Sequence, residues 1–244
     1  MISKNSIINN LKTLFYALII AVIIRSLLLQ PFYIPSSSME PNLLVGDRLF
    51  VTKYSYGYSK HSFPFSPNIF EGRILFSEPK RGDVVVFKTP ADNRTDYIKR
   101  LIGLPGDLIQ FIDGNLHINN NQVLKTIIET TDTVFCGNNI MNVNFFNEKL
   151  SSGKIYKATY SSEYSFQNSD KFIVPENHYF FLGDNRDCSK DSRFLSEVGY
   201  VHQDNIVGKA QFLFFSSDYR IGSIFKFWEW SNIIRFNRFF KKIN

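Results

Sequence analysis

Two short segments of the chain contain residue types that could perform nucleophilic catalysis. The first, residues 34–41, carries three consecutive serines, Ser36, Ser37 and Ser38. A serine hydroxyl is a poor nucleophile until a neighbouring base takes its proton, so a serine site requires a base from elsewhere in the chain. Taken alone, the segment is typical of a linker, because Ser and Pro are ordinary loop residues.

The base that such a serine needs is a histidine or an amine. The chain has four histidines, His61, His117, His178 and His202. None lies in a recognisable triad context, and no Gly-x-Ser-x-Gly elbow is present. The second segment, residues 97–107, offers Lys99 among apolar neighbours. Burial would lower its pKa from about 10.4 and yield a neutral amine that accepts a proton, whereas a lysine on an alternating strand can also face solvent.

The residues around both segments favour a β-rich domain, because short apolar runs alternate with Gly, Pro, Asn and Asp. Strands are predicted at residues 84–87, 97–102, 108–112, 116–118, 179–182 and 206–215. Residues 113–115, Asp-Gly-Asn, predict a hairpin turn, since these residues accept positive φ at low cost. The polar stretch from about 119 to 175 is interpreted as a small β-rich insert on the main sheet.

The N-terminal part of the chain predicts a membrane anchor within residues 1–30. Residues 13–24 carry no charge, and Arg25 near the end of the apolar run can extend to the interface. A cleavable leader is the alternative, but the run is longer than a usual leader core and residues 30–35 lack a small-x-small cleavage pattern. Lys4 and Lys12 favour a cytoplasmic N-terminus, which places the later residues on the extracytoplasmic side.

Composition limits the class of protein. A length of 244 residues supports one sizeable core with a smaller insert, and we expect the β domain to span residues 31–218. The 28 Lys and Arg exceed the 22 Asp and Glu, giving a net charge of +6. Such an excess is typical of proteins that bind nucleic acid or anionic membranes. The absence of a zinc-finger or RNP signature, together with the anchor, favours the membrane.

Residues 219–244 form a tail that mixes aromatic with basic residues. This composition favours an interfacial helix lying on anionic headgroups. An amphipathic helix packed on its own domain would have the same pattern. The tail is too charged to span a bilayer, so we expect it to be membrane-proximal.

Four segments resemble the sequence boxes of the bacterial type I signal peptidases. They are residues 35–43, 81–87, 97–107 and 183–193, and they occur in the family's order behind a matching anchor. The resemblance implies a mainly β fold, with one transmembrane helix followed by an antiparallel catalytic domain. It further implies a serine endopeptidase of the bacterial inner (plasma) membrane that removes signal peptides from exported preproteins after a small-x-small motif. Such an enzyme uses no metal or organic cofactor.

The resemblance assigns roles to individual positions. The serine before Met is the nucleophile, hence Ser38, and the lysine of the Tyr-Ile-Lys-Arg box is the general base, hence Lys99. Ser36 matches a residue that lends its hydroxyl to the oxyanion hole, beside the backbone N–H of the nucleophile. These three positions are the expected reaction centre.

Further positions match supporting and substrate-binding residues of the family. Ser189 matches a serine that hydrogen-bonds the lysine, and Asp191 and Arg193 match a carboxylate and a guanidinium that hold the region together. The positions that match the lining of two shallow substrate pockets are Phe32, Ile34, Met39, Leu43, Val86, Tyr97 and Ile98.

The two cysteines depart from the family pattern. Cys188 stands where Asn is common, and only Cys136 lies in the insert, where some relatives carry a cysteine pair. Two thiols permit one disulfide but no framework. We expect Cys136 and Cys188 not to pair.

Two rival interpretations remain. A self-cleaving repressor-type Ser-Lys protease would share the core, although an export anchor argues against it. A membrane-anchored, non-catalytic β domain that binds exported partners is the alternative from another class. Retention of Ser38, Lys99 and Ser189 favours catalysis. The expected partners are signal peptides of exported preproteins and membrane lipid, and nucleic acid is not expected.

Overall fold

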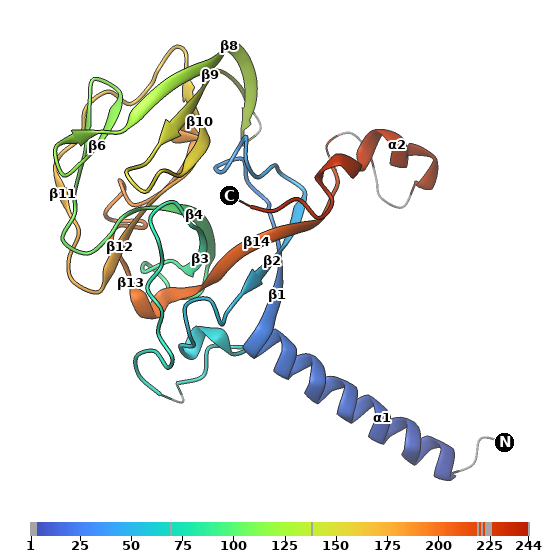
Figure 1. Cartoon of the computed structure of the whole chain (residues 1–244). Coiled ribbons are helices and arrows are strands. Elements are labelled where there is room, and N and C mark those ends of the chain that lie inside the picture. Colours follow the sequence, from blue (N-terminus) through green and yellow to red (C-terminus); the bar gives the residue numbers. More distant parts are fainter. Residues whose placement is uncertain are drawn as a thin grey trace.

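The computed structural model describes residues 4–68, 70–137, 139–218, 220, 222 and 226–243. Figure 1 shows one long N-terminal helix that leads into a domain built of strands. The helix is α1 (Lys4–Ile23), which a π-helical turn continues over Ile24–Leu28. The strands are β1 (Leu29–Tyr33), β2 (Asp47–Thr52), β3 (Val84–Lys88), β4 (Asp96–Gly103), β5 (Leu108–Ile112), β6 (Asn115–Ile118), β7 (Asn121–Gln122), β8 (Leu124–Cys136), β9 (Asn139–Lys149), β10 (Ile155–Ser161), β11 (Phe172–Ile173), β12 (His178–Leu182), β13 (Val201–His202) and β14 (Ile206–Ser216). The expected mainly β fold with a single N-terminal apolar helix is confirmed.

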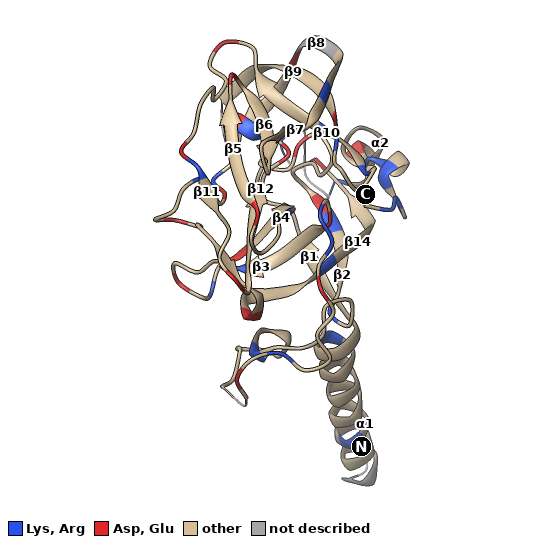
Figure 2. Ribbon diagram, turned by 60° about the vertical axis from the view of Figure 1, so that its left-hand side comes forward, with Lys and Arg blue, Asp and Glu red and all other residues tan. Residues whose placement is uncertain are grey.

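The helical segment has the length and composition of a membrane span. The span Ser6–Leu28 has a mean hydropathy of 2.0, and only 6% of its most apolar window is buried by the rest of the chain. Figure 2 shows that charged residues are sparse along α1. Exposing a continuous apolar helix to water is unfavourable, so this segment is suited to lipid.

The main sheet has seven strands in the order β1-β2-β14-β3-β4-β12-β13, and the pairs are antiparallel. Strand β4 lies between β3 and β12, with Lys99 opposite Val85 in register. The loop that follows β1 returns to form β2 and carries Ser38. The fold thereby joins the two sequence segments that the chemistry requires.

Both faces of β3 are covered, which explains its continuous apolar run. Val84 and Val86 pack in one core cluster with residues of β1, β2 and β14, whereas Val85 and Phe87 pack in another with Leu101. Neighbouring residues of a strand point to opposite faces, so a run without alternation indicates burial on both sides. Lys99, on the adjacent strand, therefore enters an apolar interior.

The predicted hairpin is confirmed. The strands that follow it form two small sheets. Asp113 and Gly114 join β5 to β6 with φ of 48° and 71°. Strands β7 and β11 extend this hairpin into a four-stranded sheet, while β8, β9 and β10 form a separate three-stranded sheet. The long β8–β9 hairpin carries Cys136 at its end.

The expectation that the cysteines do not pair is wrong. Cys136 and Cys188 form a disulfide, with their Cα atoms 5.5 Å apart. The two residues are 52 positions apart in sequence, so their proximity depends on where the β8–β9 hairpin ends. That hairpin returns to the 3-10 turn Arg186–Cys188, a tertiary contact that residue spacing does not reveal.

The tail does not form the expected long helix over its described residues. It contains one short helix, α2 (Trp230–Ile233), flanked by 3-10 turns. Bridges pair Ser217 with Ile234 and Phe212 with Lys242, which requires extended backbone. Arg238 is buried against Asp47, so this part of the tail packs on the domain without forming the expected helix.

Candidate active site

The structure brings Ser38 and Lys99 into direct contact. Ser38 lies in the loop after β1 and Lys99 lies on β4, and the Oγ of the serine is hydrogen-bonded to the Nζ of the lysine. The residues are 7% and 4% exposed. The pair is therefore largely sheltered from bulk water but keeps a small exposed area.

The surroundings of Lys99 favour its neutral form. Burial lowers the pKa of the ammonium from 10.5 to about 8, although Asp191 and Asp184 act in the opposite direction. The ring of Tyr97 lies 5.6 Å from the Nζ atom. A lysine with this pKa supplies a neutral amine near pH 8, so it can accept the proton of the serine hydroxyl in contact with it.

The two other serines of the segment have different settings. Ser36 is exposed, and its Oγ lies 3.4 Å from the Oγ of Ser38. Ser37 is buried, and its Oγ lies 3.8 Å from the Sγ of Cys188. Ser36 is thus exposed to solvent and close to the Oγ atom of Ser38, whereas Ser37 lies against the disulfide.

Ser189 lies beside the nucleophile but does not bond to Lys99. Its Oγ is buried and, among the described residues, has no hydrogen-bond partner. A Cβ on Gly183 would lie 2.2 Å from this Oγ and 2.5 Å from the carbonyl oxygen of Ser38. Only glycine fits between the two. The expected bond from Ser189 to Lys99 is not observed, and the Lys99 Nζ atom contacts Ser38 Oγ. A buried hydroxyl without a partner is uncommon in folded proteins.

Asp191 and Arg193 lie together as expected. The guanidinium of Arg193 donates to both carboxylate oxygens of Asp191, at 2.8 and 2.9 Å, and also to the carbonyl oxygen of Arg186. The backbone N–H of Gly183 donates to Asp191 at 3.0 Å. These bonds fix the turn after β12 against the site.

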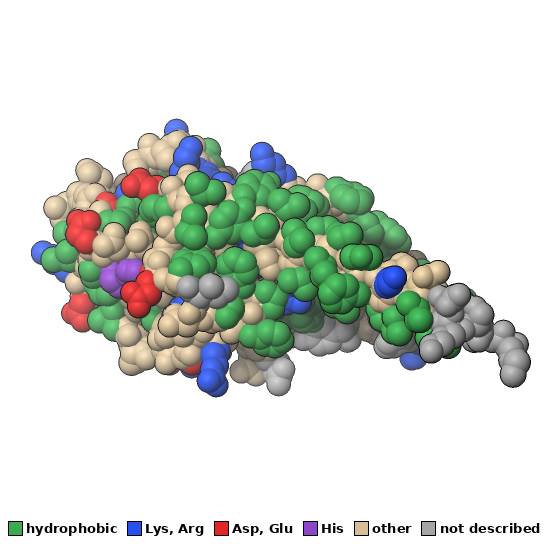
Figure 3. All heavy atoms as spheres, turned by 90° about the horizontal axis from the view of Figure 1, so that it is seen from below, with side chains coloured by type: hydrophobic (Ala, Val, Ile, Leu, Met, Phe, Trp, Pro, Cys, Tyr) green, Lys and Arg blue, Asp and Glu red, His purple; other side chains and the backbone are tan. Residues whose placement is uncertain are grey.

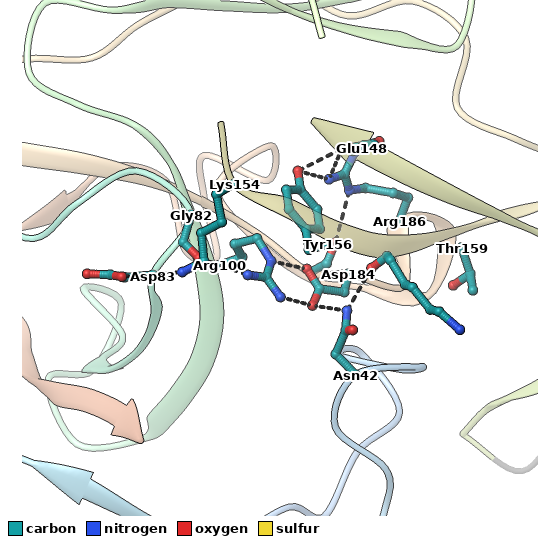
Figure 4. A network of polar contacts seen from close by, with 12 residues as sticks. Asn42, Gly82, Asp83, Arg100, Glu148, Lys154, Tyr156, Thr159, Asp184 and Arg186 are labelled. Atoms are coloured by element: carbon teal, nitrogen blue, oxygen red, sulfur yellow. Dashed lines mark hydrogen bonds and ion pairs between the residues drawn. The ribbon is translucent and has the colours of Figure 1, made fainter. Parts of the chain in front are cut away.

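A buried ion pair lies next to the dyad, the contacting pair Ser38 and Lys99, and the sequence had not indicated a role for it. Arg100 donates to both oxygens of Asp184 at 2.7 Å, and both side chains are fully buried. The amide of Asn42 donates to the same carboxylate at 2.7 Å (Figure 4). Arg100 follows Lys99 directly on β4, so the pair holds that strand to the nucleophile loop. Two adjacent cations in an apolar strand are the signal that could have revealed this carboxylate partner.

A second buried ion pair joins the insert to the site. Arg186 donates to both oxygens of Glu148 at 2.7 Å, and the hydroxyls of Tyr156 and Tyr160 donate to the same carboxylate. Burial tends to raise the pKa of Glu148, but Arg186 and the two hydroxyls hold it below its usual value. Glu148 on β9 thereby holds Arg186 (Figure 4). Arg186 begins the turn that also carries Cys188.

Asn185 is a further residue that sequence reasoning left without a role. Its backbone N–H donates to the carbonyl oxygen of Ser38 at 3.1 Å, and its side-chain amide donates to that of Ser37 at 3.3 Å. These bonds orient the backbone of the nucleophile loop.

The apolar residues expected to line substrate pockets divide by exposure. Four of them are at most 2% exposed and pack in one core cluster, namely Ile34, Met39, Leu43 and Val86. Phe32, Tyr97 and Ile98 are partly exposed. Tyr97 packs with the core cluster on the other face of β3. Side chains without exposed area support a surface, so only the partly exposed three offer contact area to a peptide.

The family model and the sequence relatives agree on one family. The family model "signal peptidase, peptidase S26" matches residues 7–215. The chain is 42% identical to signal peptidase I of Rickettsia conorii, over 93% of this chain and 90% of that protein. It is 39% identical to signal peptidase I of Rickettsia bellii, over 95% and 84%. A crystal structure of a signal peptidase I from Enterococcus faecalis is 27% identical, covers 55% of this chain and 97% of that one, and has a TM-score of 0.33.

Proposed function

Because the chain belongs to the signal peptidase family, peptidase S26, we propose that Ser38 and Lys99 carry out its reaction as nucleophile and general base. The protein is a membrane-associated serine endopeptidase that removes signal peptides from exported preproteins. The observation that carries the assignment is the buried contact between Ser38 Oγ and Lys99 Nζ. A nucleophile and a base within hydrogen-bond reach are the minimum that such catalysis requires.

In the acylation step, neutral Lys99 takes the proton of the Ser38 hydroxyl. The Ser38 Oγ atom attacks the carbonyl carbon of the residue before the scissile bond. The hydroxyl of Ser36 and the backbone N–H of Ser38 donate to the oxyanion that forms. The protonated lysine then gives its proton to the leaving amine, which becomes the N-terminus of the mature protein, and an ester remains on Ser38.

In the deacylation step, Lys99 is again the base. It takes a proton from a water molecule, which attacks the ester carbonyl. Ser38 leaves with the proton that the lysine returns, and the signal peptide departs with a free carboxylate. Lys99 is neutral again at the end of the cycle.

Three groups position this pair in the proposed mechanism. The Arg100–Asp184 pair holds β4 against the loop that carries Ser38, and the Asp191–Arg193 pair holds the turn behind it. The buried hydroxyl of Ser189 lies beside the nucleophile, has no partner among the described residues, and would be available to a protonated lysine or to substrate. Their effect is orientation, which matters because a displacement of about 1 Å can cost about 10²-fold in rate.

The proposed specificity is a small residue immediately before the cut and a small or aliphatic residue two positions earlier. This specificity is supported by the tight packing of the side chains beneath Ser38 and Lys99. Met39 and Leu43 are at most 1% exposed, so neither side chain offers exposed apolar area to a large substrate side chain. Phe32 and Ile98, which pack against this core cluster and remain partly exposed, would then contact the substrate.

We also propose the placement of the chain relative to the membrane. Residues 1–30 would form the short cytoplasmic segment and the anchor, and residues 31–218 the extracytoplasmic catalytic domain. Lys4 and Lys12 at the start of the chain support this orientation. Residues 219–244 would be a tail packed on the domain near the membrane.

The proposal is tested by incubating the purified full-length protein with a preprotein and comparing Ser38→Ala with wild type. We expect the wild type to cut after a small residue and Ser38→Ala to be slower by at least about 10³-fold. Ser151→Ala, on an exposed turn, is the matched control and should cleave normally. Equal cleavage by wild type and Ser38→Ala would reject the assignment, and absence of cleavage in both would favour a non-catalytic binding domain.

A further inference from the structure

A cavity of about 520 Å³ lies at the base of the anchor, away from the dyad. Its lining comes from the end of the helical segment, from the loop after β2 and from the β3–β4 loop. Figure 1 shows these loops beside the end of α1. The cavity contains an unusual number of cations, namely Arg25, Lys60, Lys88 and Arg94.

The acidic residues of the cavity are already engaged. Asp96 pairs with Lys88 at 2.9 Å. Asp92 accepts the hydroxyl of Thr95 and the backbone N–H groups of Arg94 and Thr95. Asp96 thus neutralises Lys88, whereas Asp92 keeps its negative charge because the groups that donate to it are neutral.

Three cations of the cavity have no anionic partner within the described part of the chain. They are Arg25, Lys60 and Arg94, and none forms a salt bridge there. Four cations against two carboxylates give the lining of the cavity a net positive charge, which favours binding of an anion.

The pKa values of two nearby groups, His61 and Lys53, are lowered by burial and by the cations of the cavity. Burial and then Lys60 and Lys88 lower the pKa of His61 to about 4, so this cavity residue is neutral at physiological pH. Behind it, burial and then Arg25 lower the pKa of Lys53 to about 8. Burial is the larger cause of both shifts, and the neighbouring cations add to it.

The cavity also adjoins apolar surface. Phe65 lines it and is fully exposed, and Leu27 and Leu28 at the end of the span are exposed as well. Figure 3 shows hydrophobic side chains along the helix and over the adjoining underside of the domain. A ligand suited to this place has an anionic head and an apolar tail.

We propose that the cavity binds the phosphate of an anionic phospholipid from the leaflet on the domain's side of the membrane. Arg25, Lys60 and Arg94 surround the phosphate, and Phe65 lies against the acyl chain. Arg25 lies three residues before the end of the apolar span Ser6–Leu28, where its long side chain can reach the headgroups. The site rests on the membrane anchor and is independent of the Ser38–Lys99 assignment.

The test titrates the full-length protein in detergent micelles with phosphatidylglycerol, with phosphatidylcholine of the same acyl chains, and with inorganic phosphate. Native mass spectrometry counts the bound lipid, and calorimetry follows the phosphate. We expect saturable binding of phosphatidylglycerol, on the order of 10-fold tighter than phosphatidylcholine, and weak binding of phosphate.

Variants locate the site. Lys60→Gln combined with Arg94→Gln should weaken phosphatidylglycerol binding by on the order of 10-fold, because each cation at a membrane surface adds substantially to the attraction. Lys149→Gln combined with Lys171→Gln removes the same charge from exposed positions at the end of β9 and just before β11, and should change nothing. Arg94→Glu alone, on an exposed loop, provides the same comparison if the double variant does not fold.

Two results would overturn the proposal. One is equal phosphatidylglycerol affinity in the wild type and in the folded Lys60 and Arg94 variants. The other is inorganic phosphate binding as tight as phosphatidylglycerol and unaffected by Phe65→Ser, which would identify a soluble anion site instead. Weaker phosphatidylglycerol binding by Phe65→Ser supports contact with the acyl chain.

Discussion

At the scale of single residues, the chemistry depends on how Lys99 is buried. Strand β4 puts it in an apolar interior with Arg100 on the next position, and Arg100 has a carboxylate of its own in Asp184. Asp191 is likewise engaged by Arg193. Because both nearby carboxylates are paired with arginines, neither forms an ion pair with the lysine, and burial lowers its pKa.

Substitutions at Lys99 should separate activity from stability. Lys99→Arg should be inactive, because a guanidinium remains protonated and cannot act as a base. Lys99→Met should also be inactive, yet at pH 7 it should unfold with a free energy higher by on the order of 1–3 kcal/mol, since burying the ammonium in the wild type is unfavourable. Preprotein cleavage and urea unfolding measure the two effects. Activity in Lys99→Arg would contradict the assignment of the base.

The pH dependence of cleavage should follow the neutral form of Lys99. With a pKa of about 8, the rate should rise about tenfold per pH unit below pH 8 and level off above it. Raising the pH removes the proton from the amine, so the sign is a gain on the alkaline side. Single-turnover rates from pH 6 to 10 measure this profile, and a rate independent of pH over that range would point to another base.

At the scale of elements, apolar patterning predicted the strands well and long-range contacts poorly. The strands at 84–87, 97–102 and 206–215 were predicted nearly to their ends, because alternating or continuous apolar runs bounded by turn residues are local signals. The disulfide and the fold of the tail depend on which distant surfaces meet. No local pattern encodes that meeting, and the same holds for the carboxylate that each buried arginine finds.

The disulfide should support activity more than folding. Cys188 is adjacent to Ser189 and its Sγ contacts Ser37, so the bond ties the β8–β9 hairpin directly to the nucleophile loop. Cys136→Ser with Cys188→Ser should keep the fold and cleave on the order of 10-fold more slowly, because the loop is less well positioned. Dithiothreitol should slow the wild type equally and leave the double variant unchanged. A wild-type rate that reductant does not alter would refute this role.

The Glu148–Arg186 pair should be a main element of stability. Glu148→Ala should lower the free energy of unfolding by about 3–5 kcal/mol, because it leaves the guanidinium of Arg186 buried without its counter-charge. Glu197→Ala breaks the exposed pair with Lys190 and should lower the free energy of unfolding far less, because water screens that pair. Urea unfolding of both variants gives the comparison, and equal losses would mean that burial of the pair has no special effect.

At the scale of the whole molecule, the anchor and the site form one continuous arrangement. Strand β1 begins where the helical segment ends, and the loop after β1 carries Ser38. The apolar part of a substrate's signal peptide occupies the same bilayer as α1. A catalytic residue this close to the anchor therefore suits substrates whose cleavage site lies just outside the membrane.

The tail adds a further tie to this arrangement. Arg238 donates to Asp47 at the start of β2 and to the carbonyl oxygen of Asn42 in the nucleophile loop. Asn42 in turn donates to Asp184. The C-terminal part of the chain is thereby connected, through Asn42, to the buried pair beside Lys99.

The most direct test of the central claim is to trap the ester on Ser38. A preprotein mixed with enzyme is quenched in acid within one turnover, and the digested protein is analysed by mass spectrometry. We predict that the peptide containing Ser38 carries the signal peptide as an ester, with the mass of the signal peptide minus one water, and that the adduct is missing in Ser38→Ala and Lys99→Met. Cleavage without any adduct on Ser38, or an adduct on another residue, would contradict the account.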